Sequence, residues 1–418
     1  MEDKKKDTGR HNIAVKIFTQ KGLFDILNDD IAELYFVEDI FSVYITGKLT
    51  FYDKFNALEL MSFTGHEYIY VLYGEDNPIQ KLFAIYNVAN ISPIIQTEGT
   101  SFSVTELYFT EVDYVPFTQS RHSKSWLNTK VSSIINDIYI NMVNSEKVFQ
   151  IFEETNEKMN FCMPYWTPSE AIRWLMCRVS GKETKTAGYL LFSNSKGFNF
   201  TTIEKLFRNR DIEMSEGKVL YYEFGPTDGL YPNKILGWAI DGIDKQSLLG
   251  LQGGKKFGYN WATKGLLTKE YTYADTISKY TMFGKKTLFT NISDNSIKLD
   301  MDGDSDEKTL ENIAHSEFIK RYSKQLSVKI TVRGHERRYA GMLASIMWKS
   351  GEKEKILNKA MDGKYLVATI VHQFSGNMQP TYRQMLTLIK NAYTDSDFKY
   401  LHNATIVDKE IKNKKILK

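Results

Sequence analysis

The stretch KLFAIYNVANIS (residues 81–92) returns near the other end of the chain as KYLVATIVHQFS (residues 364–375). Both copies open with lysine and close with serine, and this alignment places Val88 in register with Val371. Most other positions are apolar at matching places, as expected for strands of a packed sheet. The repeat predicts that one structural element is used twice.

Each copy is followed, after a turn-like gap, by another run in which apolar and polar residues roughly alternate: SFSVTELYF (101–109) and TYRQMLTLIK (381–390). Alternation with a period of two is typical of a strand with one buried face. Each copy therefore opens a hairpin, and two similar hairpins predict two similar β-domains.

The chain has 418 residues and a mass of 48.4 kDa, which favours two to four domains over a single core. Apolar residues make up 42% of it, enough for such cores. The 54 basic residues are scattered among 51 acidic ones, with a net charge of +3. This balance argues against the basic stripe of a typical nucleic-acid-binding protein.

No run approaches eighteen apolar residues, and the N-terminal MEDKKKDTGRHN lacks the apolar core of a signal peptide. We therefore expect a soluble protein made in a cytoplasm. Cys162 and Cys177 are the only cysteines. This usage fits a reducing compartment better than a disulfide framework.

The first part of the chain, residues 12–115, reads as an unbroken succession of strands, which favours an antiparallel barrel or sandwich. β-branched and aromatic residues are enriched in these runs, and Gly, Asn, Asp or Pro separate them. The predicted strands lie in AVKIF (14–18), ELYFVEDIFSVYITGKLTFYD (33–53), EYIYVLYG (67–74), KLFAIYNVANI (81–91) and SFSVTELYFTEV (101–112).

Residues 116–213 predict a mixed α+β module. In SRHSKSWLNTKVSSIINDIYINMV (120–143), four apolar residues recur at helical spacing: Val131, Ile134, Ile135 and Ile138. A second helix is expected in TPSEAIRWLMCRVSG (167–181), with Thr167 as N-cap, Pro168 at the first position, Glu170 closing a capping box and Gly181 at the stop. GYLLFSNSKGFNF (188–200) then predicts a hairpin that turns near residues 194–196.

A second β-barrel is predicted from residues 214–246 and 325–395, and residues 247–324 are predicted to be an insertion. Strand patterns occur in KVLYYEF (218–224), ILGWAIDGID (235–244), SVKITV (327–332) and GMLASIMW (341–348), the last expected to be a core strand. The insertion opens with a Gly- and Lys-rich stretch, 247–304, without a clear regular element, and continues with a helix in 307–326. Residues 396–418 form a basic tail that is expected to be disordered.

DMDGDSDEKTLE (300–311) is the best candidate for a metal loop, because four of its residues match calcium-loop positions one, three, five and twelve: Asp300, Asp302, Asp304 and Glu311. The sixth position is Ser305 where the sharp turn needs glycine, and Glu307 stands at the usually apolar eighth. Acidic residues before a helix are also favoured by its dipole, with Ser305 or Asp306 as cap. The helix-start interpretation is favoured, and no metal site is predicted.

Other chemical motifs are absent or incomplete. GLQGGKK (250–256) lacks the spacing and the following Ser or Thr of a phosphate loop, so a surface loop is favoured. Its Lys255 and Lys256 remain candidates for a cavity lining or an acidic partner. No serine lies in G-x-S-x-G and neither cysteine has a nucleophile signature. The sequence therefore predicts no enzyme activity, no catalytic residue and no cofactor.

The histidines and tryptophans fit structural roles. The histidines, which include His66, His122, His315, His335 and His372, do not share the spacing of metal ligands. For His372 we expect a surface position or a neutral ring with satisfied hydrogen bonds. Trp166 and Trp174 beside the capped helix are more simply explained by packing than by a binding site.

Five stretches, in order along the chain, carry a resemblance to a known family: IAVKIFTQKG (13–22), VYITGKLTFYD (43–53), MPYWTPSEAIRWLMCRVSG (163–181), GYLLFSNSKGFNF (188–200) and GKYLVATIVHQFSGNMQPTYRQMLTLIKNAY (363–393). Together they make the chain similar to the central baseplate hub protein of contractile-tailed bacteriophages. The stretches are packing and capping motifs spread over most of residues 13–393. The region 247–304 matches least well.

The resemblance implies two tail-tube-like antiparallel β-barrels in each subunit and a homotrimer whose ring of six similar domains resolves a symmetry mismatch. Such a ring adapts a hexameric tail tube or tube-initiator protein to a trimeric cell-puncturing spike, and wedge proteins surround it. It also implies a virion protein of the tail baseplate, assembled in the host cytoplasm. After the spike leaves, the ring becomes a conduit for DNA, which is only transiting cargo, without stable membrane insertion.

Three alternatives remain open. The chain could be the hub of a related contractile injection machine. A tail-associated peptidoglycan hydrolase would need a catalytic constellation in residues 247–304. A glycan-binding module would use exposed Tyr and Trp as sugar platforms, but most aromatic residues occupy alternating, core-like positions.

Overall fold

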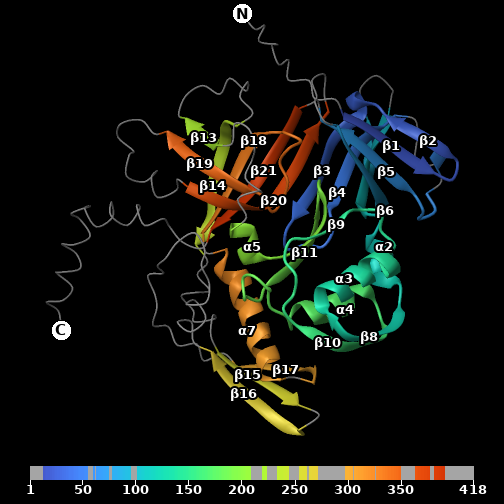
Figure 1. Cartoon of the computed structure of the whole chain (residues 1–418). Coiled ribbons are helices and arrows are strands. Elements are labelled where there is room, and N and C mark those ends of the chain that lie inside the picture. Colours follow the sequence, from blue (N-terminus) through green and yellow to red (C-terminus); the bar gives the residue numbers. More distant parts are fainter. Residues whose placement is uncertain are drawn as a thin grey trace, which may run out of the picture.

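The computed structural model describes residues 13–54, 60–61, 63–74, 78–95, 101–208, 219–223, 233–243, 254–260, 263–271, 297–304, 306–324, 326–349, 363–376 and 381–390. A thirteen-stranded sheet dominates the fold, and a mixed α+β module and a smaller sheet lie below it in Figure 1. None of the described helices has both the length and the apolar composition of a membrane span. The predicted basic tail lies outside the described residues.

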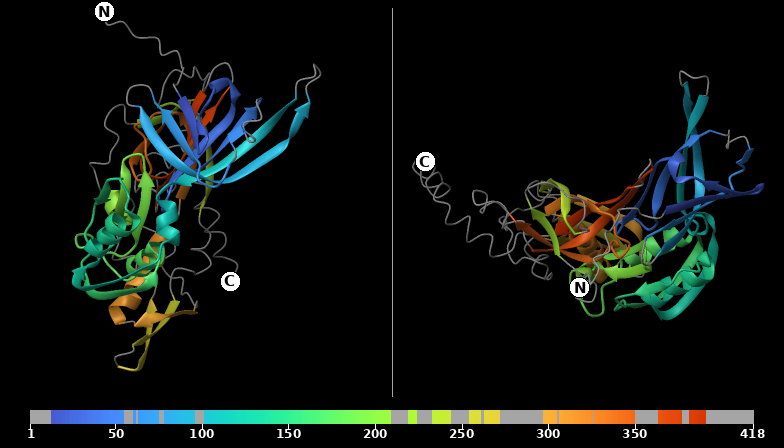
Figure 2. Two further views of the ribbon diagram at one scale, coloured as in Figure 1. Left: turned by 90° about the vertical axis from the view of Figure 1, so that its right-hand side faces the viewer. Right: turned by 90° about the horizontal axis from the view of Figure 1, so that it is seen from above.

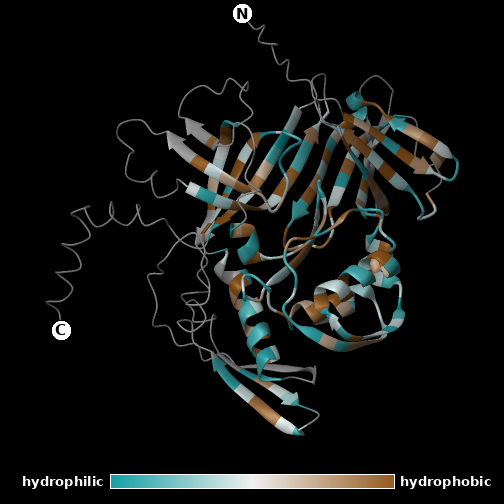
Figure 3. Ribbon diagram, in the orientation of Figure 1, coloured by the Kyte–Doolittle hydropathy of each residue, from teal (hydrophilic) through white to brown (hydrophobic). Residues whose placement is uncertain are grey.

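The first half of the large sheet contains seven strands and one 3-10 turn: β1 (Ile13–Thr19), β2 (Gly22–Ile26), η1 (Asn28–Asp30), β3 (Ile31–Asp39), β4 (Thr46–Asp53), β5 (Tyr68–Tyr73), β6 (Ile79–Ile95) and β7 (Ser101–Glu111). The strands follow the order β3-β4-β7-β6-β5-β1-β2 and all pair antiparallel. Apolar and polar residues alternate along them (Figure 3), and the buried face encloses a core that includes Leu49 and Phe51. The predicted strands are confirmed, and β2, which was not among them, pairs with β1 and is largely exposed.

The second half contains six strands: β13 (Val219–Glu223), β14 (Ile235–Ile243), β18 (Leu326–Arg333), β19 (Leu343–Lys349), β20 (Gly363–Ser375) and β21 (Thr381–Lys390). Their order is β14-β18-β21-β20-β19-β13, antiparallel except for the parallel pair β13 and β19. Buried residues of these strands form a second core with Leu190 and Phe192 of the module. The predicted strands of this half are therefore confirmed.

The two halves share one strand order, because β3-β4-β7-β6-β5-β1 corresponds position by position to β14-β18-β21-β20-β19-β13. The repeated stretches are β6 and β20, and each is the first strand of the central hairpin. Each also carries a β-bulge just beyond the part that pairs with the preceding strand, at Tyr86 and at Ala368. The sequence repeat therefore marks a repeat of topology, including a local irregularity.

The strand pairing corrects the alignment of the repeat by one residue. Val88 lies opposite Leu107 of β7, and its counterpart opposite Leu386 of β21 is Ile370, not Val371. Val88 packs against the first core and Ile370 lies within the second. A shift of one residue moves a strand's side chains to the other face, so only the pairing-based alignment places core residue on core residue.

The two halves join into one sheet because β20 pairs antiparallel with β3, Thr369 with Asp39 through Phe374 with Leu34. We call this junction the seam. On the same edge, the first residues of β20 pair with β19 and its later residues pair with β3. The hairpin of β6 and β7 instead projects from the body of the molecule (Figure 2).

The module between the halves contains α2 (Tyr114–Gln119), β8 (His122–Lys130), α3 (Val131–Ile138), a π-helical turn η2 (Tyr139–Val143), β9 (Phe149–Ile151), β10 (Lys158–Trp166), α4 (Pro168–Met176), β11 (Tyr189–Asn194), β12 (Gly197–Thr202) and α5 (Ile203–Arg208). The four predicted apolar residues of α3 are buried in a third core. Residues 122–130, placed before this helix without a strand prediction, form β8.

The predicted start of α4 is confirmed. Thr167 accepts a hydrogen bond from the amide of Glu170, and the Glu170 carboxylate accepts one from the amide of Thr167. The helix ends at Met176, earlier than the stop predicted at Gly181, and a β-bridge pairs Gly181 with Thr155 instead. The predicted hairpin is confirmed as β11 and β12.

The stretch 247–304, for which the sequence predicted no regular element, contributes a three-stranded sheet of β15 (Gly254–Asn260), β16 (Gly265–Tyr271) and β17 (Ile297–Asp304). The predicted helix follows as α7 (Glu307–Tyr322) and leads from this sheet up to the large one (Figure 1). In the sequence, the small sheet and α7 lie between β14 and β18, and these two strands pair with each other in the large sheet. The division of the chain into domains with the bounds given above remains a prediction.

Candidate functional site: a polar seam, a charged junction and two sheet edges

The seam packs aromatic rings of the two halves against each other. Phe36 of β3 stacks on His372 of β20, with ring centroids 4.5 Å apart, and its centroid is 6.0 Å from that of Phe374. All three side chains are buried. Offset stacking of aromatic rings stabilises such a contact beyond the free energy gained by burying apolar surface.

Polar side chains of the second half form a chain of hydrogen bonds that ends at the seam. Arg338 donates to Gln384 at 2.8 Å, Gln384 donates to the Tyr382 hydroxyl at 2.8 Å, and that hydroxyl lies 2.7 Å from Nδ1 of His372. Because the hydroxyl accepts from Gln384, its proton is available to Nδ1, which leaves the ring proton on Nε2. Nε2 lies 3.7 Å from Oε1 of Glu38 on β3.

Glu38 and His372 are both fully buried, and burial dominates the pKa of each. Burial raises the pKa of Glu38 to about 7, although Lys81 and the hydrogen bond from the Ala340 amide act against the shift. Burial lowers the pKa of His372 to about 3, and the charges of Lys81 and Arg338 act in the same direction. Both shifts favour uncharged side chains, as expected in a low-dielectric interior.

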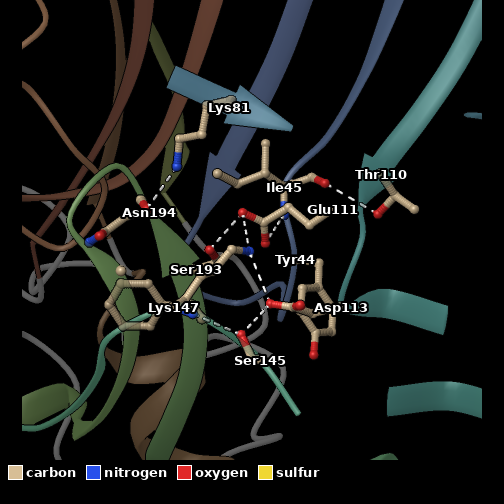
Figure 4. Close-up of polar contacts among 12 residues, drawn as sticks. Tyr44, Ile45, Lys81, Thr110, Glu111, Asp113, Ser145, Lys147, Ser193 and Asn194 are labelled. Carbon is tan, nitrogen blue, oxygen red and sulfur yellow. Dashed lines mark hydrogen bonds and ion pairs between the residues drawn. The ribbon is translucent and has the colours of Figure 1, made fainter. Parts of the chain in front are cut away.

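A second polar cluster ties the first half of the sheet to the module (Figure 4). Glu111, at the end of β7, accepts hydrogen bonds from the Ser193 hydroxyl at 2.8 Å and the Ile45 amide at 3.4 Å. Its Oε1 also lies 2.8 Å from Nζ of Lys147, which is 3.4 Å from Asp113. We call this group the charged junction.

Lys81, the first residue of the repeated stretch, lies beside the charged junction and donates to the Asn194 carbonyl at 3.1 Å (Figure 4). Burial lowers the pKa of its ammonium, while Glu111 and Glu38 oppose that shift. Lys81 thus lies between the charges of the seam and those of the junction. Under the pairing-based alignment its counterpart in the second copy is Gly363, which carries no charge, and the adjacent Lys364 is exposed.

Two edges of the large sheet have no hydrogen-bonded neighbouring strand among the described residues, although β13 approaches β14 without pairing with it. One is the outer edge of β14, whose other edge pairs with β18; the second is the distal part of β6, residues 87–95, which pairs with β7 alone. In the shared strand order these edges correspond to β3 and to residues 369–375 of β20, the two strands of the seam. Each of the two strand edges that form the seam therefore has a counterpart in the other half, and that counterpart pairs with no described strand.

Apolar side chains on β14 are exposed where their counterparts on β3 are buried. Both strands carry a bulge just after their first residue, which matches Trp238 to Leu34 and Ile240 to Phe36. Leu34 and Phe36 are 0% exposed, whereas Trp238 is 45% and Ile240 is 50% exposed. The β20 hairpin covers the pair on β3, whereas the pair on β14 stays about half exposed. Exposed apolar side chains along a strand edge are typical of an interaction site.

The candidate metal loop has a different structure from a calcium loop. Asp300, Asp302 and Asp304 belong to β17, whose backbone is extended and pairs with β15, whereas a calcium loop wraps around its ion. Asp306 caps α7 by accepting a hydrogen bond from the Thr309 amide at 2.6 Å, as the favoured interpretation predicted. Within the described ranges, no three His, Cys, Asp or Glu residues gather as a metal site would require.

The Gly- and Lys-rich candidate is partly a strand. Gly254, Lys255 and Lys256 begin β15, and residues 250–253 lie outside the described residues. Lys256 is buried and its Nζ lies 2.8 Å from Glu317 of α7, so it joins the insertion's sheet to its helix.

The other candidates take structural places. Trp166 and Trp174 pack around Phe161, with centroids 6.3 Å and 5.3 Å from its ring, which supports the packing interpretation. His372 is buried and accepts a hydrogen bond, and His315 is buried on α7. Cys162 and Cys177 are free thiols.

The buried charges were not predicted from the sequence. Glu38 follows Leu34 and Phe36 on one face of β3, and His372 lies between Ile370 and Phe374 on one face of β20. A charged or polar residue at an apolar position of an alternating strand was the available signal. That these two residues face each other leaves no such signal, because they lie far apart in the sequence.

No sequence model of a protein family matches the chain, and no curated protein matches it. Two solved structures align along nearly all of it. The 43 kDa tail protein of prophage MuSo2 from Shewanella oneidensis has a TM-score of 0.56 at 10% identity and covers 91% of this chain and 99% of its own. The tail protein from Neisseria meningitidis MC58 has a TM-score of 0.56 at 11% identity and covers 92% and 99%. The chain therefore has the mainly antiparallel β-fold of phage tail proteins, as its resemblance to a baseplate hub implied.

Proposed function

We propose that the chain is the central hub of a contractile-tail baseplate, a homotrimer whose subunits form a ring of six similar β-domains. The observation that carries this proposal is the unpaired edge on each half of the large sheet, matched to the two strands of the seam. The pairing that joins β3 to β20 within one chain can also form between the corresponding edges, β14 and the distal part of β6, of two chains.

The second seam joins β14 of one copy to the distal part of β6 of the next. By correspondence with the pairing of β3 and β20, it is antiparallel and places Ile240 opposite Asn90 and Ala239 opposite Ile91 of the neighbouring copy. It also covers Trp238 and Ile240, as the β20 hairpin covers Leu34 and Phe36. Because the two edges lie on different halves, the contact is head-to-tail, and the proposal is that its rotation closes the ring after three copies.

Three copies give six domains, the number needed to meet a hexameric tail tube or tube initiator on one side and a trimeric spike on the other. We assign the ring domains to residues 12–115 and to 214–246 with 325–395, and assign the module and the insertion to outward contacts, including those with wedge proteins. The role is structural and non-enzymatic. In the virion the ring forms part of the DNA conduit.

The test is a cysteine pair across the proposed seam, Ala239→Cys with Ile91→Cys, in a chain whose two native cysteines are replaced by serine. Mild oxidation should give linked dimers and trimers of the double variant, and negative-stain images should show rings with threefold or pseudo-sixfold symmetry. Each single variant is the control and should give no ladder. A chain that stays monomeric at micromolar concentration, or cross-links without forming rings, contradicts the proposal.

A further inference from the structure

The surface around the bulge of β6 is exposed, whereas the equivalent surface of the second half is buried. The strand pairings match Tyr68, Ala84 and Tyr86, in this order, to Leu343, Leu366 and Ala368. The three counterparts are at most 4% exposed and belong to the second core. Tyr86 is 62% and Tyr68 is 37% exposed, and Ala84 is partly exposed. We call these three residues the bulge patch.

The buried counterpart of the bulge patch is covered by the connection between β3 and β4, residues 40–45. The Ile40 amide donates to the Ala368 carbonyl at 3.0 Å, so the antiparallel pairing of the seam continues for one residue beyond the end of β3. The Ile40 side chain is fully buried in the second core, and Phe41 packs against that core. The stretch that follows β3 therefore closes the surface around the bulge of β20.

The second half has a connection at the corresponding place in the chain. Because β14 corresponds to β3 and β18 to β4, the stretch that follows β14 corresponds to residues 40–45. This stretch is the start of the insertion, DKQSLLGLQG (244–253), which lies outside the described residues. Its sequence contains three leucines, Leu248, Leu249 and Leu251, as apolar counterparts of Ile40 and Phe41. It can therefore supply the kind of side chain that covers the second half.

Within one copy, the start of the insertion and the bulge patch belong to remote parts of the large sheet. Between β14 and β6 lie β18, β21, β20, β3, β4 and β7 (Figure 1). At the usual spacing of paired strands this separation is about 34 Å. In the proposed ring, by contrast, β14 of one copy pairs with β6 of the next, so the chain leaves β14 directly beside the neighbour's bulge patch.

We propose that the start of the insertion, residues 244–253, covers the bulge patch of the next copy, as residues 40–45 cover its counterpart within the chain. The inference rests on the proposed ring and extends its seam. Pairing with β4 and β18 matches Val37 to Gly242, so Lys245 takes the place of Ile40. Lys245 then lies opposite Tyr86 of the neighbouring copy, and the leucines that follow bury the exposed rings.

This contact gives the start of the insertion a role inside the ring. The strands β15 to β17 and the helix α7 remain available for outward contacts. Each boundary between copies then has two parts, the paired edges of β14 and β6 and the cover over the bulge patch. Both parts repeat what already exists at the seam between β3 and β20.

The contact is tested by a cysteine pair, Lys245→Cys with Tyr86→Cys, in the full chain with its two native cysteines replaced by serine. Mild oxidation of the assembled protein should give linked dimers and trimers. Lys245→Cys with Tyr165→Cys is the matched control, because Tyr165 is a tyrosine of the module that is 65% exposed. The control pair should give no ladder.

A charge in the bulge patch provides a second measurement. Tyr86→Asp should weaken assembly by about tenfold or more, because the carboxylate is held against apolar side chains of the next copy. Tyr165→Asp makes the same change at a similarly exposed tyrosine and should leave assembly unchanged. Mass photometry across a concentration series measures both variants, with circular dichroism as the control for folding.

The outcomes separate this inference from the ring on which it rests. If Ala239→Cys with Ile91→Cys cross-links and rings form, but Lys245→Cys with Tyr86→Cys gives no ladder, the ring stands and the cover is refuted. The same holds if Tyr86→Asp assembles like Tyr165→Asp, or if a lone Tyr86→Cys thiol reacts with maleimide as fast in the ring as in the monomer, because the patch would then face solvent or another partner. Absence of rings and of both cross-links overturns the ring and the cover together.

Discussion

Glu38 and His372 face each other across the seam between the two halves of the sheet, with Oε1 3.7 Å from Nε2 and both side chains 0% exposed. They are far apart in sequence, and each lies on a strand of a different half. Around them lie the charges of Lys81, Arg338, Glu111 and Glu336. The stability of the seam therefore depends on the protonation of both residues. Substituting one residue at a time separates the two contributions.

The two pKa shifts act in opposite directions on stability. The folded pKa of Glu38, about 7, lies above an unfolded value of about 4.3, so its contribution is lost as pH rises through that window. The folded pKa of His372, about 3, lies below an unfolded value of about 6.5, so its contribution is lost as pH falls through that window. Where the windows overlap, folded and unfolded states each bind one proton and the effects offset.

Glu38→Gln removes one of the two opposing effects. The free energy of unfolding of this variant should fall from pH 8 to pH 5 by on the order of 2 kcal/mol more than that of the natural chain, because the proton uptake of the unfolded His372 ring is no longer offset by Glu38. Urea unfolding at the two pH values measures it. His372→Gln should show the reverse slope, with stability lost as pH rises from 5 to 7. Parallel pH profiles for both variants and the natural chain would refute the pairing.

Phe36→Ala should destabilise the seam by about 3–5 kcal/mol, because it removes a buried ring that stacks on both His372 and Phe374. Tyr35→Ala, a neighbouring aromatic truncation on the other face of β3, is the control and should cost less. Chemical unfolding followed by tryptophan fluorescence measures both. A cost for Phe36→Ala no larger than that of the control would mean that the seam contributes little to stability.

Glu111→Ala should cost about 3–5 kcal/mol, because it leaves the charge of Lys147 at the junction and removes an acceptor from Ser193 and Ile45. Adding Lys147→Met should recover part of this loss, since the ammonium, left with Asp113 alone, is then no longer held at the junction. A double-mutant cycle in urea gives the coupling. Strict additivity of the two substitutions would argue against their ion pair.

Thr167→Ala should cost about 1 kcal/mol, because the hydroxyl accepts the hydrogen bond of the Glu170 amide at the start of α4. Ser133→Ala on the exposed face of α3 is the matched control, expected within about 0.5 kcal/mol of the natural chain. Thermal and chemical unfolding should rank the two in this order. Equal effects would show that the capping box adds nothing measurable.

Trp238→Asp should weaken assembly without unfolding the chain, because a charge on the open edge of β14 opposes pairing with a second copy. Leu127→Asp places the same change at a residue that is 78% exposed on the module and should leave assembly intact. Mass photometry across a concentration series, with circular dichroism as a folding control, separates the two effects. Loss of assembly in both variants would assign the effect to general charge and not to the β14 edge.

Much of the fold follows from local patterns in the sequence. Alternation predicted most strands of both halves, and the cap residues Thr167, Pro168 and Glu170 predicted where α4 begins. The strands β8 and β15 to β17 escaped prediction because their residues lack a clean alternation, and pairing with neighbours decides their conformation. The end of α4 was misplaced, because Gly181, the predicted stop, forms a bridge with Thr155 that only the tertiary structure shows.

The repeat itself could be found in the sequence, but its register could not. Val88 matches Val371 by letter, whereas the partner strands match Val88 to Ile370, because strand pairing and not letter identity decides which residues face the core. Register is a property of pairs of strands, and a single strand does not contain it.

By itself, then, the sequence determined that the chain contains two similar sets of β-strands around a capped helical module, because side-chain alternation and capping act over a few residues. Only the tertiary structure decided that the two sets form one sheet, that Glu38 faces His372, and that β14 and the end of β6 each have an edge that pairs with no strand in the described part of the chain. These features depend on hydrogen bonds and desolvation between residues hundreds of positions apart, and such long-range contacts leave no periodic trace in the sequence.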